Sequence, residues 1–300
     1  MSKILVTGGA GFIGSHVVEN LLAKNHSVCV IDNLSTGKLE NLPESNGLKF
    51  YRQDICENSL EGVFEKEKPD FVIHLAAQVS VSNSVSDPYV DAQTNILGSI
   101  NLLRLSKTYN VKKFVAASSA AVYGVPKSLP INENHPTKPI SPYGLSKITM
   151  ERYIRLSGVP YIIFRFSNAY GARQYLSKES GVISIFDKVM KNNEQINIFG
   201  DGAQIRDFIY VGDIAEVFEK AVMSDLNNET LNFSTNKGVT VNELFLMMCE
   251  IYGYKKAPIF LPEREGEIRD SILSNEKVVR LLGYDKFKTL SEGLECLKNL

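Results

Sequence analysis

The sequence predicts an α/β fold, a doubly wound parallel sheet followed by a smaller mixed α/β lobe. Two observations support this prediction. Short, continuously apolar segments recur in the first half of the chain and alternate with segments of helical periodicity, which is typical of parallel strands covered on both faces by helices. The length of 300 residues also exceeds a typical single domain, so we expect one large domain and a smaller C-terminal lobe.

The chain begins with a strand, a glycine turn and a helix. Residues 4–6 are apolar, glycines follow at positions 8, 9, 11 and 14, and apolar residues at positions 13, 17, 18, 21 and 22 have helical spacing. This order is the dinucleotide-binding unit of a Rossmann-type fold. Its glycines permit the tight turn, the close approach of the backbone to the pyrophosphate, and the packing of helix on strand. The helix N-terminus offers unpaired N–H groups and a positive dipole end to the phosphates.

The second strand, residues 27–31, ends in Asp32. This carboxylate follows the turn by about 20 residues, the place from which it would accept hydrogen bonds from the adenosine ribose hydroxyls. It would also repel a 2′-phosphate, so the pattern favours NAD over NADP as the cofactor. A structural turn followed by an exposed Asp is the alternative, and it leaves the full pattern unexplained.

Two further strands are predicted to end at the same edge of the sheet. Residues 48–52 lead to Asp54, which either accepts a hydrogen bond from the adenine amino group or caps a helix that starts at residue 57. Residues 70–75 lead to Ala76 and Ala77, whose small side chains let the backbone pass close to a bound dinucleotide. His74 lies in that strand, and we interpret it as a packed residue rather than an acid or base.

A long helix and a fifth strand follow. The helix is predicted at residues 89–109 and contains Asn95, whose amide either faces solvent or braces the catalytic loops. The strand is predicted at residues 112–117 and is closed by Ser118 and Ser119. Ligands of open parallel sheets bind outside the carboxyl ends of the strands, so both hydroxyls point toward the expected cofactor crevice. The alternative is that they only cap the following turn.

Tyr143 and Lys147 lie four residues apart at the start of another predicted helix, so both side chains share one face. This spacing alone is common in chains of this size, and its meaning comes from its place after the fifth strand and Ser119. An ammonium next to a phenol favours the phenolate and lowers its pKa, which would make Tyr143 a usable base near neutral pH. Lys147 also suits a contact with the nicotinamide ribose.

The composition excludes several classes of protein. The net charge is −1, so no broad electrostatic field attracts nucleic acid or an anionic membrane. No apolar run reaches the length of a membrane span, and no signal-peptide pattern precedes the strand that starts at residue 3. The four cysteines lack Cys-x-x-Cys spacing and the four histidines form no ligand cluster, so we expect a cytoplasmic protein with no metal site.

The regular alternation of strands and helices gives way to mixed elements from residue 172. The predicted division is therefore an NAD-binding domain at residues 1–171 and a mainly substrate-binding lobe at residues 172–300, from which some segments return to the first domain. We expect helices at residues 181–191, 213–223, 241–252 and 275–282, short strands at 231–233 and 258–261, and Thr240 and Ser291 as helix N-caps.

Taken together, the motifs resemble those of the extended short-chain dehydrogenase/reductases, and within them the UDP-galactose (UDP-glucose) 4-epimerase-like nucleotide-sugar epimerases. The resemblance covers essentially the whole chain, and the motifs stand in the family's order. They are residues 7–14 (TGGAGFIG), 32–33 (DN), Asp54, 74–77 (HLAA), 118–124 (SSAAVYG), 143–147 (YGLSK), 165–171 (RFSNAYG), 206–213 (RDFIYVGD) and 264–267 (REGE).

The resemblance implies the residues of the site. Ser119, Tyr143 and Lys147 are the implied catalytic set. The implied NAD site consists of Gly8, Gly11, Phe12, Ile13, Asp32, Asn33, Ser35, Gly37, Asp54, Ile55, Leu75, Ala76, Ala77, Asn95, Tyr143 and Lys147. The implied substrate site consists of Ser119, Tyr143, Asn168, Asn197, Phe199, Arg206, Arg264 and Ser271.

Three of the implied substrate contacts have a physical reason and an alternative. Arg206 and Arg264 would contact the substrate diphosphate, because guanidinium forks suit phosphate oxygens and a chain without net positive charge needs a local clamp. A surface ion pair is the alternative for each arginine, and for Arg206 the neighbouring Asp207 would be the partner. Ser271 either leaves room for an N-acetyl group on the sugar or begins a strand away from the substrate.

The predicted activity is the NAD-dependent 4-epimerisation of a UDP-sugar, either UDP-glucose/UDP-galactose or the N-acetylhexosamine forms, through a 4-keto intermediate. A nucleotide-sugar dehydratase or a keto-sugar reductase of the same family is the first alternative. The dehydratases need acid/base residues where this chain has Ala120 and Ala121. A non-catalytic NAD-binding regulator is the second alternative, and it has no need of the catalytic set.

The resemblance also implies the partners of the protein. A UDP-sugar is the expected substrate, and neither nucleic acid nor a membrane is expected to bind. A homodimer is expected to form through the helices at residues 89–109 and 143–156.

Overall fold

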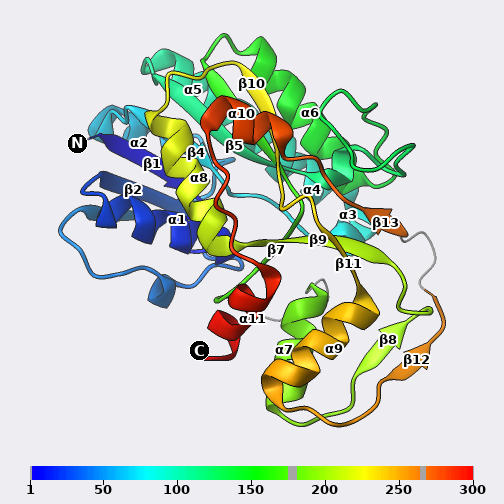
Figure 1. The fold of residues 1–300 in the computed structure, drawn as a ribbon. Coiled ribbons are helices and arrows are strands. Elements are labelled where there is room, and N and C mark those ends of the chain that lie inside the picture. The colour runs from blue at the N-terminus through cyan, green and yellow to red at the C-terminus, as the bar shows by residue number, and fades with distance from the viewer. Residues whose placement is uncertain (1, 175–180, 264–267, 300) are drawn as a thin grey trace.

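The computed structural model describes residues 2–174, 181–263 and 268–299. Its centre is a seven-stranded sheet in the order β10-β6-β5-β4-β1-β2-β3, in which every neighbouring pair is parallel (Figure 1). This order confirms the predicted doubly wound sheet. The strands are β1 (Lys3–Thr7), β2 (Ser27–Asp32), β3 (Leu48–Arg52), β4 (Phe71–His74), β5 (Lys113–Ser119), β6 (Tyr161–Phe166) and β10 (Glu229–Phe233).

The sheet is covered by helices on both faces, which explains the continuous apolar runs of its strands. Side chains alternate between the faces of a strand, so Ile4 and Val6 of β1 pack on one face and Leu5 packs on the other. Fully burying a side chain such as Ile4 contributes about 1.5–3 kcal/mol relative to leaving it exposed. The first face is covered by α1 (Phe12–Ala23), α8 (Val211–Met223) and α10 (Glu276–Leu282), and the second by α2 (Leu60–Glu67), α5 (Ser99–Thr108) and α6 (Pro142–Leu156).

The helix predicted at residues 89–109 is interrupted. After the short α3 (Val81–Ser86), α4 (Pro88–Ala92) passes into a π-helical segment, η2 (Gln93–Gly98), before α5 continues. Asp87 caps α4, because its side chain accepts a hydrogen bond from Val90 N. The wider π turn changes which side chains face inward, and both Asn95 and Ser99 are buried.

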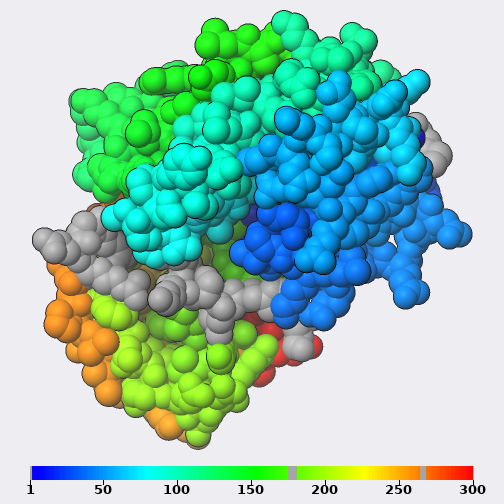
Figure 2. All heavy atoms as spheres, turned by 180° about the vertical axis from the view of Figure 1, so that it is seen from behind, coloured from blue at the N-terminus to red at the C-terminus, as the bar shows by residue number. Residues whose placement is uncertain are grey.

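The later part of the chain forms a second group of elements below the large sheet (Figures 1 and 2). Its core includes Phe186, Phe245 and Leu294, and lies between helices α7 (Val182–Lys191), α9 (Val241–Tyr252) and α11 (Leu290–Lys298). In contrast, β10 and α8 return to the large sheet, where β10 pairs with β6 and α8 packs against α1. The small strands are β7 (Asn168–Tyr170), β9 (Ile205–Tyr210), β11 (Gly238–Thr240) and β13 (Asp270–Ser271) in one sheet, and β8 (Asn197–Phe199) with β12 (Ile259–Leu261) in another.

None of the helices that the structure describes combines the length and the apolar character of a membrane span. The two short 3₁₀ segments are η1 (Leu39–Asn41) and η3 (Ala120–Val122).

Two of the predicted helix starts are wrong. The helix expected from residue 57 begins at Leu60, so Asp54 does not cap it. The last helix is capped by Thr289 rather than Ser291, because the Thr289 side chain accepts from Glu292 N and the Glu292 side chain accepts from Thr289 N. Thr240 caps α9 through the same kind of capping box, as predicted.

The space around two glycines predicts opposite effects of Gly→Ala substitutions on the stability of the protein. A Cβ at Gly14 would overlap Gly8 O, whereas a Cβ at Gly62, in the exposed interior of α2, would meet no atom within 4 Å. We expect Gly14→Ala to lower the free energy of unfolding by about 1–3 kcal/mol through overpacking. We expect the control, Gly62→Ala, to raise it by about 0.5–1 kcal/mol. Urea denaturation measures both changes, and equal stability of the two variants would contradict the close packing at Gly14.

Candidate active site

A cavity of about 1100 Å³ lies at the carboxyl ends of the central strands and extends to the small strands β7, β8 and β9. This volume lies slightly above the roughly 300–1,000 Å³ of a typical small-molecule pocket. Most predicted site residues line its wall. They are Gly8, Gly11, Phe12, Ile13, Asp32, Asn33, Ser35, Asp54, Ile55, Leu75, Ala76, Ala77, Ser119, Tyr143, Lys147, Asn168, Asn197, Phe199 and Arg206.

The glycine turn lies at one end of the cavity, between β1 and α1. Gly8 has a φ of +69°, a left-handed conformation that favours glycine, and a Cβ there would lie 2.6 Å from Ala76 N. Gly8 N donates to Ile31 O at 2.8 Å, which fixes the turn to β2. Gly11 is the N-cap of α1 and has no side chain to cap the first N–H groups of the helix. The turn therefore presents a helix N-terminus suited to an anion.

Asp32 closes the same end of the cavity and is only 7% exposed. Its Oδ2 accepts from Ala10 N at 3.0 Å, and its Oδ1 accepts from Leu34 N at 2.8 Å. An ionised carboxylate has about four acceptor positions, so both oxygens retain the capacity to accept from a ribose hydroxyl. The two backbone donors hold the carboxylate in place for that contact.

Asp54 lies beside the loop that follows Asp32. It accepts hydrogen bonds from Asn33 Nδ2 at 2.7 Å and from Cys56 N at 2.9 Å. Although burial raises the pKa of Asp54, these hydrogen bonds outweigh burial and lower it overall. Asn33 Oδ1 in turn accepts from Ser35 N at 2.9 Å, so the three side chains shape one wall of the cavity.

His74 is a buried residue of the strand, as predicted, and its hydrogen bonds identify its neutral form. Thr7 Oγ1 accepts from Leu75 N and Ala76 N, each at 3.2 Å, so its own hydrogen points to His74 Nδ1 at 2.8 Å. The ring proton is therefore on Nε2, which donates to Ser99 Oγ at 2.9 Å. Burial lowers the pKa of His74 to about 3, in agreement with a neutral ring. The network ties the glycine turn to the loop after β4.

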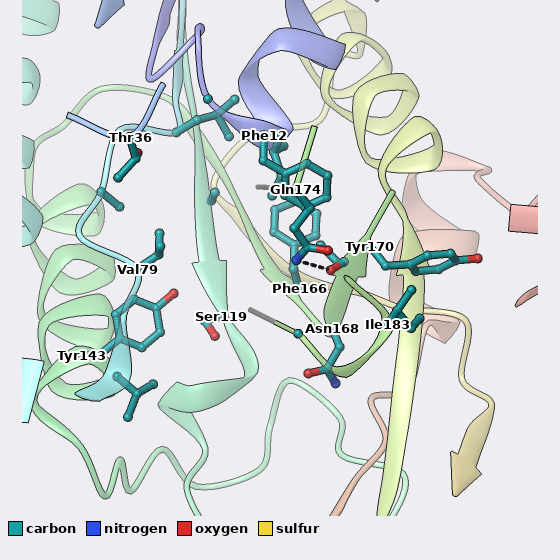
Figure 3. A pocket seen from close by; sticks show the side chains of 18 of the residues that line it. Phe12, Thr36, Val79, Ser119, Tyr143, Phe166, Asn168, Tyr170, Gln174 and Ile183 are labelled. Carbon is teal, nitrogen blue, oxygen red and sulfur yellow. Dashed lines mark hydrogen bonds between the residues drawn. The ribbon is translucent and has the colours of Figure 1, made fainter. Parts of the chain in front are cut away.

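Ser119 and Tyr143 meet because the start of α6 packs against the turn after β5. A Cβ at Gly144 would lie 2.6 Å from Ala121 O, and Ser141 caps the helix by accepting from Gly144 N at 3.1 Å. Figure 3 shows the hydroxyl of Tyr143 pointing toward Ser119. Ser119 Oγ also accepts from Ala121 N at 3.2 Å. Ser119 therefore lines the cavity, as predicted, and also caps the turn, so the alternative that it only caps the turn is wrong.

Lys147 lies one helical turn after Tyr143 and is only 4% exposed. Its Nζ donates to Ala117 O at 3.2 Å and lies 5.9 Å from the centre of the Tyr143 ring. Burial lowers the pKa of Lys147 to about 8 and raises the pKa of Tyr143 to about 12. The expected lowering of the Tyr143 pKa is therefore wrong for this structure, because the loss of hydration favours the neutral form of both groups.

Arg206 lies at the other end of the cavity, on β9. Its Nη1 donates to Arg269 O at 2.7 Å. Neighbouring residues of a strand face opposite sides, and Asp207 is fully buried, where it accepts from Thr235 N at 3.1 Å and Thr235 Oγ1 at 2.8 Å. The carboxylate of Asp207 therefore hydrogen-bonds inside the protein, while Arg206 lines the cavity.

Three predicted site residues lie outside the described cavity wall, and a fourth is not among the described residues. Asn95 and Gly37 do not line the cavity in the described parts of the chain; Asn95 is 1% exposed and hydrogen-bonds within the fold. Ser271 also lies outside the described lining, in β13, where it pairs with Arg206 in register, as the strand alternative predicts. Arg264 lies outside the described residues.

Several lining residues were not identified from the sequence. They come from segments that carry no motif, and only the closing of the small strands over the sheet brings them together. They include Val79, Ser82, Gln174, Gln195 and Gln204. A run of amides and apolar side chains has no spacing that would distinguish it from ordinary surface or core positions.

The residues at the glycine turn fit a dinucleotide. The turn leaves no room for a Cβ at Gly8, which is expected where backbone must approach a pyrophosphate. The acceptors of Asp32 suit ribose hydroxyls and disfavour a 2′-phosphate. Ala76 and Ala77 present short side chains beside Gly8, so the fit extends across the sheet toward Tyr143.

Comparisons with known proteins agree with this geometry. A model of the NAD dependent epimerase/dehydratase family matches residues 4–233. A relative from Methanocaldococcus jannaschii is 46% identical over 305 aligned residues, which cover 99% of this chain and 97% of the relative.

Two solved structures are also similar along almost the whole chain. One is a UDP-glucose 4-epimerase with UDP-glucose from Thermotoga maritima, 43% identical with a TM-score of 0.95, covering 99% of this chain and 97% of that one. The other is a UDP-N-acetylglucosamine 4-epimerase from Methanobrevibacter ruminantium in complex with UDP-N-acetylmuramic acid, 35% identical with a TM-score of 0.94 and the same coverage.

These matches confirm the resemblance found in the motifs, since both the family model and the full-length similarities extend over the glycine turn, Ser119, Tyr143 and Lys147. The chain belongs to the NAD dependent epimerase/dehydratase family and is an NAD-dependent epimerase.

Proposed function

We propose that the protein catalyses the 4-epimerisation of a UDP-sugar through a 4-keto intermediate. The observation that carries this proposal is the convergence of Ser119, Tyr143 and Lys147 on one cavity, with the dinucleotide turn at one end and Arg206 at the other. The names of the two similar structures support UDP-hexoses as substrates, and they differ in the N-acetyl group. The assay below distinguishes these sugars.

The proposed reaction assigns one role to each side chain. Tyr143 takes the proton of the sugar 4-hydroxyl in its phenolate form, which is a minor form near neutral pH because burial raises its pKa. Ser119 donates a hydrogen bond to the developing carbonyl, and the Lys147 ammonium stabilises the phenolate. NAD, when bound, supplies the acceptor and donor of two electrons for carbon 4. Arg206 holds the diphosphate while the keto sugar turns, so that carbon 4 is reduced on its other face without net oxidation.

Of the alternatives, a dehydratase is disfavoured by the turn that follows Ser119. Ala120 and Ala121 form η3 there and carry no acid or base. A non-catalytic NAD-binding regulator would not need the approach of Tyr143 to Ser119. A keto-sugar reductase differs from an epimerase in consuming its cofactor, and this difference can be measured directly.

The first experiment uses the purified protein with no added cofactor. UDP-galactose, UDP-N-acetylgalactosamine and UDP-glucuronate are supplied separately, and their anomeric protons are followed by NMR. We expect conversion to the 4-epimer of at least one sugar, without net formation of NADH, because each turnover returns the electrons. No conversion of any of them, even after NAD is supplied, would contradict epimerisation of UDP-sugars and favour the reductase or dehydratase.

The role of Tyr143 predicts a large effect from the loss of one oxygen. We expect Tyr143→Phe to keep NAD bound and to lower turnover by at least ~100-fold, the scale of a lost general base. Tyr153→Phe is the matched control, because Tyr153 lies on the same helix, is 44% exposed and is outside the described lining of the cavity. Turnover of Tyr143→Phe within a few-fold of the control would refute the assignment.

We also propose a homodimer through the α4–α5 segment and α6. These elements pack against each other and expose large apolar side chains, including Tyr89 at 73%, Leu97 at 58%, Leu145 at 57% and Leu156 at 82%. Exposed apolar surface of this kind marks an interaction site. A second copy of the same helices would cover it symmetrically.

The dimer predicts a specific response to one charge. We expect a dimeric mass at micromolar concentration, and a monomeric mass for Leu156→Glu, because a carboxylate would be desolvated in the interface. Sedimentation equilibrium measures both masses, and circular dichroism checks that the variant is folded. A monomeric parent protein would exclude the dimer.

A further inference from the structure

Asp91 is a buried carboxylate that has no role in the mechanism described above. It lies in α4 and is only 1% exposed. Its Oδ1 accepts from Gln78 Nε2 and from Asn95 Nδ2, each at 3.0 Å, and both donors are neutral amides. Among the described residues, no cationic side chain forms an ion pair with it. A buried carboxylate is tolerated as an anion only where it is hydrogen-bonded and paired with a cation, and these two amides supply hydrogen bonds but no charge.

The amides that hold Asp91 also connect it to α6. Asn95 Nδ2 lies 3.1 Å from Ser146 Oγ, to which it can donate, and Ser146 immediately precedes Lys147. Asn95 Oδ1 accepts from Gln78 N at 2.9 Å, so the loop after β4 is part of the same cluster. Both α4 and η2 pack against α6. The carboxylate of Asp91 is thus fixed at the back of the helical turn that carries Lys147.

We propose that Asp91 is the counter-anion of Lys147, which holds it in the ammonium form from behind α6 and so sets the protonation of the Tyr143–Lys147 pair. Asp91 is outside the described lining of the cavity, so this is a positioning residue and not a catalytic one. The effect on catalysis rests on the proposed function, whereas the effect on the Lys147 amine does not.

The other groups around Lys147 do not replace Asp91. Glu151 lies one turn further along α6, but its carboxylate accepts from Arg165 at 2.8 and 2.7 Å and from Arg155 at 2.8 Å. His74 of β4 is neutral, and Ala117 of β5 offers only its carbonyl oxygen.

The electrostatics of the pair agree with this geometry. Burial lowers the pKa of Lys147, and Asp91 opposes that effect more than Glu151 does. Tyr143 responds in the same direction: burial raises its pKa, and the charge of Asp91 raises it further. Removing the charge of Asp91 therefore lowers the pKa of both groups of the pair.

The decisive experiment titrates Lys147 in the folded protein. The lysine ¹³Cε resonances are followed with pH, and the signal of Lys147 is assigned by its loss in Lys147→Met. We expect Asp91→Asn to lower the pKa of Lys147 by about one unit. Asp87→Asn is the matched control, because it removes an equal charge from the exposed N-cap of the same helix, and Asn caps as well as Asp. Asp91→Ser is a second neutral variant should Asp91→Asn fail to fold.

An unchanged Lys147 titration in a folded neutral variant of Asp91, or an equal shift in Asp87→Asn, would overturn the proposal. The pH profile of kcat/KM for the sugar that is converted provides the second readout. We expect both limbs of the profile to move to lower pH in Asp91→Asn, while a merely structural role would lower the rate with both limbs unchanged. If Asp91→Asn shifts the Lys147 titration but the parent protein converts no sugar, the proposed function is refuted and the role of Asp91 remains.

Discussion

The close approach of two backbones, at Gly8 and Ala76, is the constraint on which the rest of the site depends. A Cβ at Gly8 would lie 2.6 Å from Ala76 N, so the turn after β1 can pass the end of β4 only without a side chain. Thr7 and His74 hold the two segments together through a hydrogen-bond network in which each proton is assigned. This approach places the helix N-terminus, Asp32 and the short side chains after β4 around one end of a single cavity.

A second close approach determines where the reactive side chains lie. Gly144 lets the start of α6 contact the turn after β5, and the hydroxyl of Tyr143 thereby points toward Ser119. The same helix carries Lys147 into an almost fully buried position. Burial favours the neutral amine and the neutral phenol, so the helix alone does not provide an ammonium. The π-helical segment contains Asn95, which faces inward and holds the carboxylate of Asp91 behind α6. This carboxylate is the proposed counter-anion that favours the ammonium form of Lys147.

The second group of elements completes the cavity without extending the large sheet. β9 carries Arg206 to the wall, and its neighbour Asp207 is buried in hydrogen bonds to the segment at Thr235. Because neighbouring residues of a strand face opposite sides, one strand serves both the cavity and the core. β10 and α8 return to the large sheet and pack in its core, whereas the second group of elements has a core of its own between α7, α9 and α11.

The sequence by itself determined the parallel sheet, the glycine turn and the residues that end its strands, because each depends on short-range patterns: apolar runs, glycine spacing and the place of Asp32, Ser119 and Tyr143. It also indicated NAD through the acidic residue after β2. It did not determine the π-helical segment at residues 93–98 or the burial of Asn95, since a π turn cannot be recognised from apolar periodicity. The direction of the Tyr143 pKa shift was also predicted wrongly, because burial leaves no pattern in the sequence. Spacing shows that an ammonium is near, but only the tertiary structure decides how much water both groups lose. The placement of Ser271 in a strand outside the cavity wall, and of the glutamines within it, likewise depends on contacts between segments far apart in the chain.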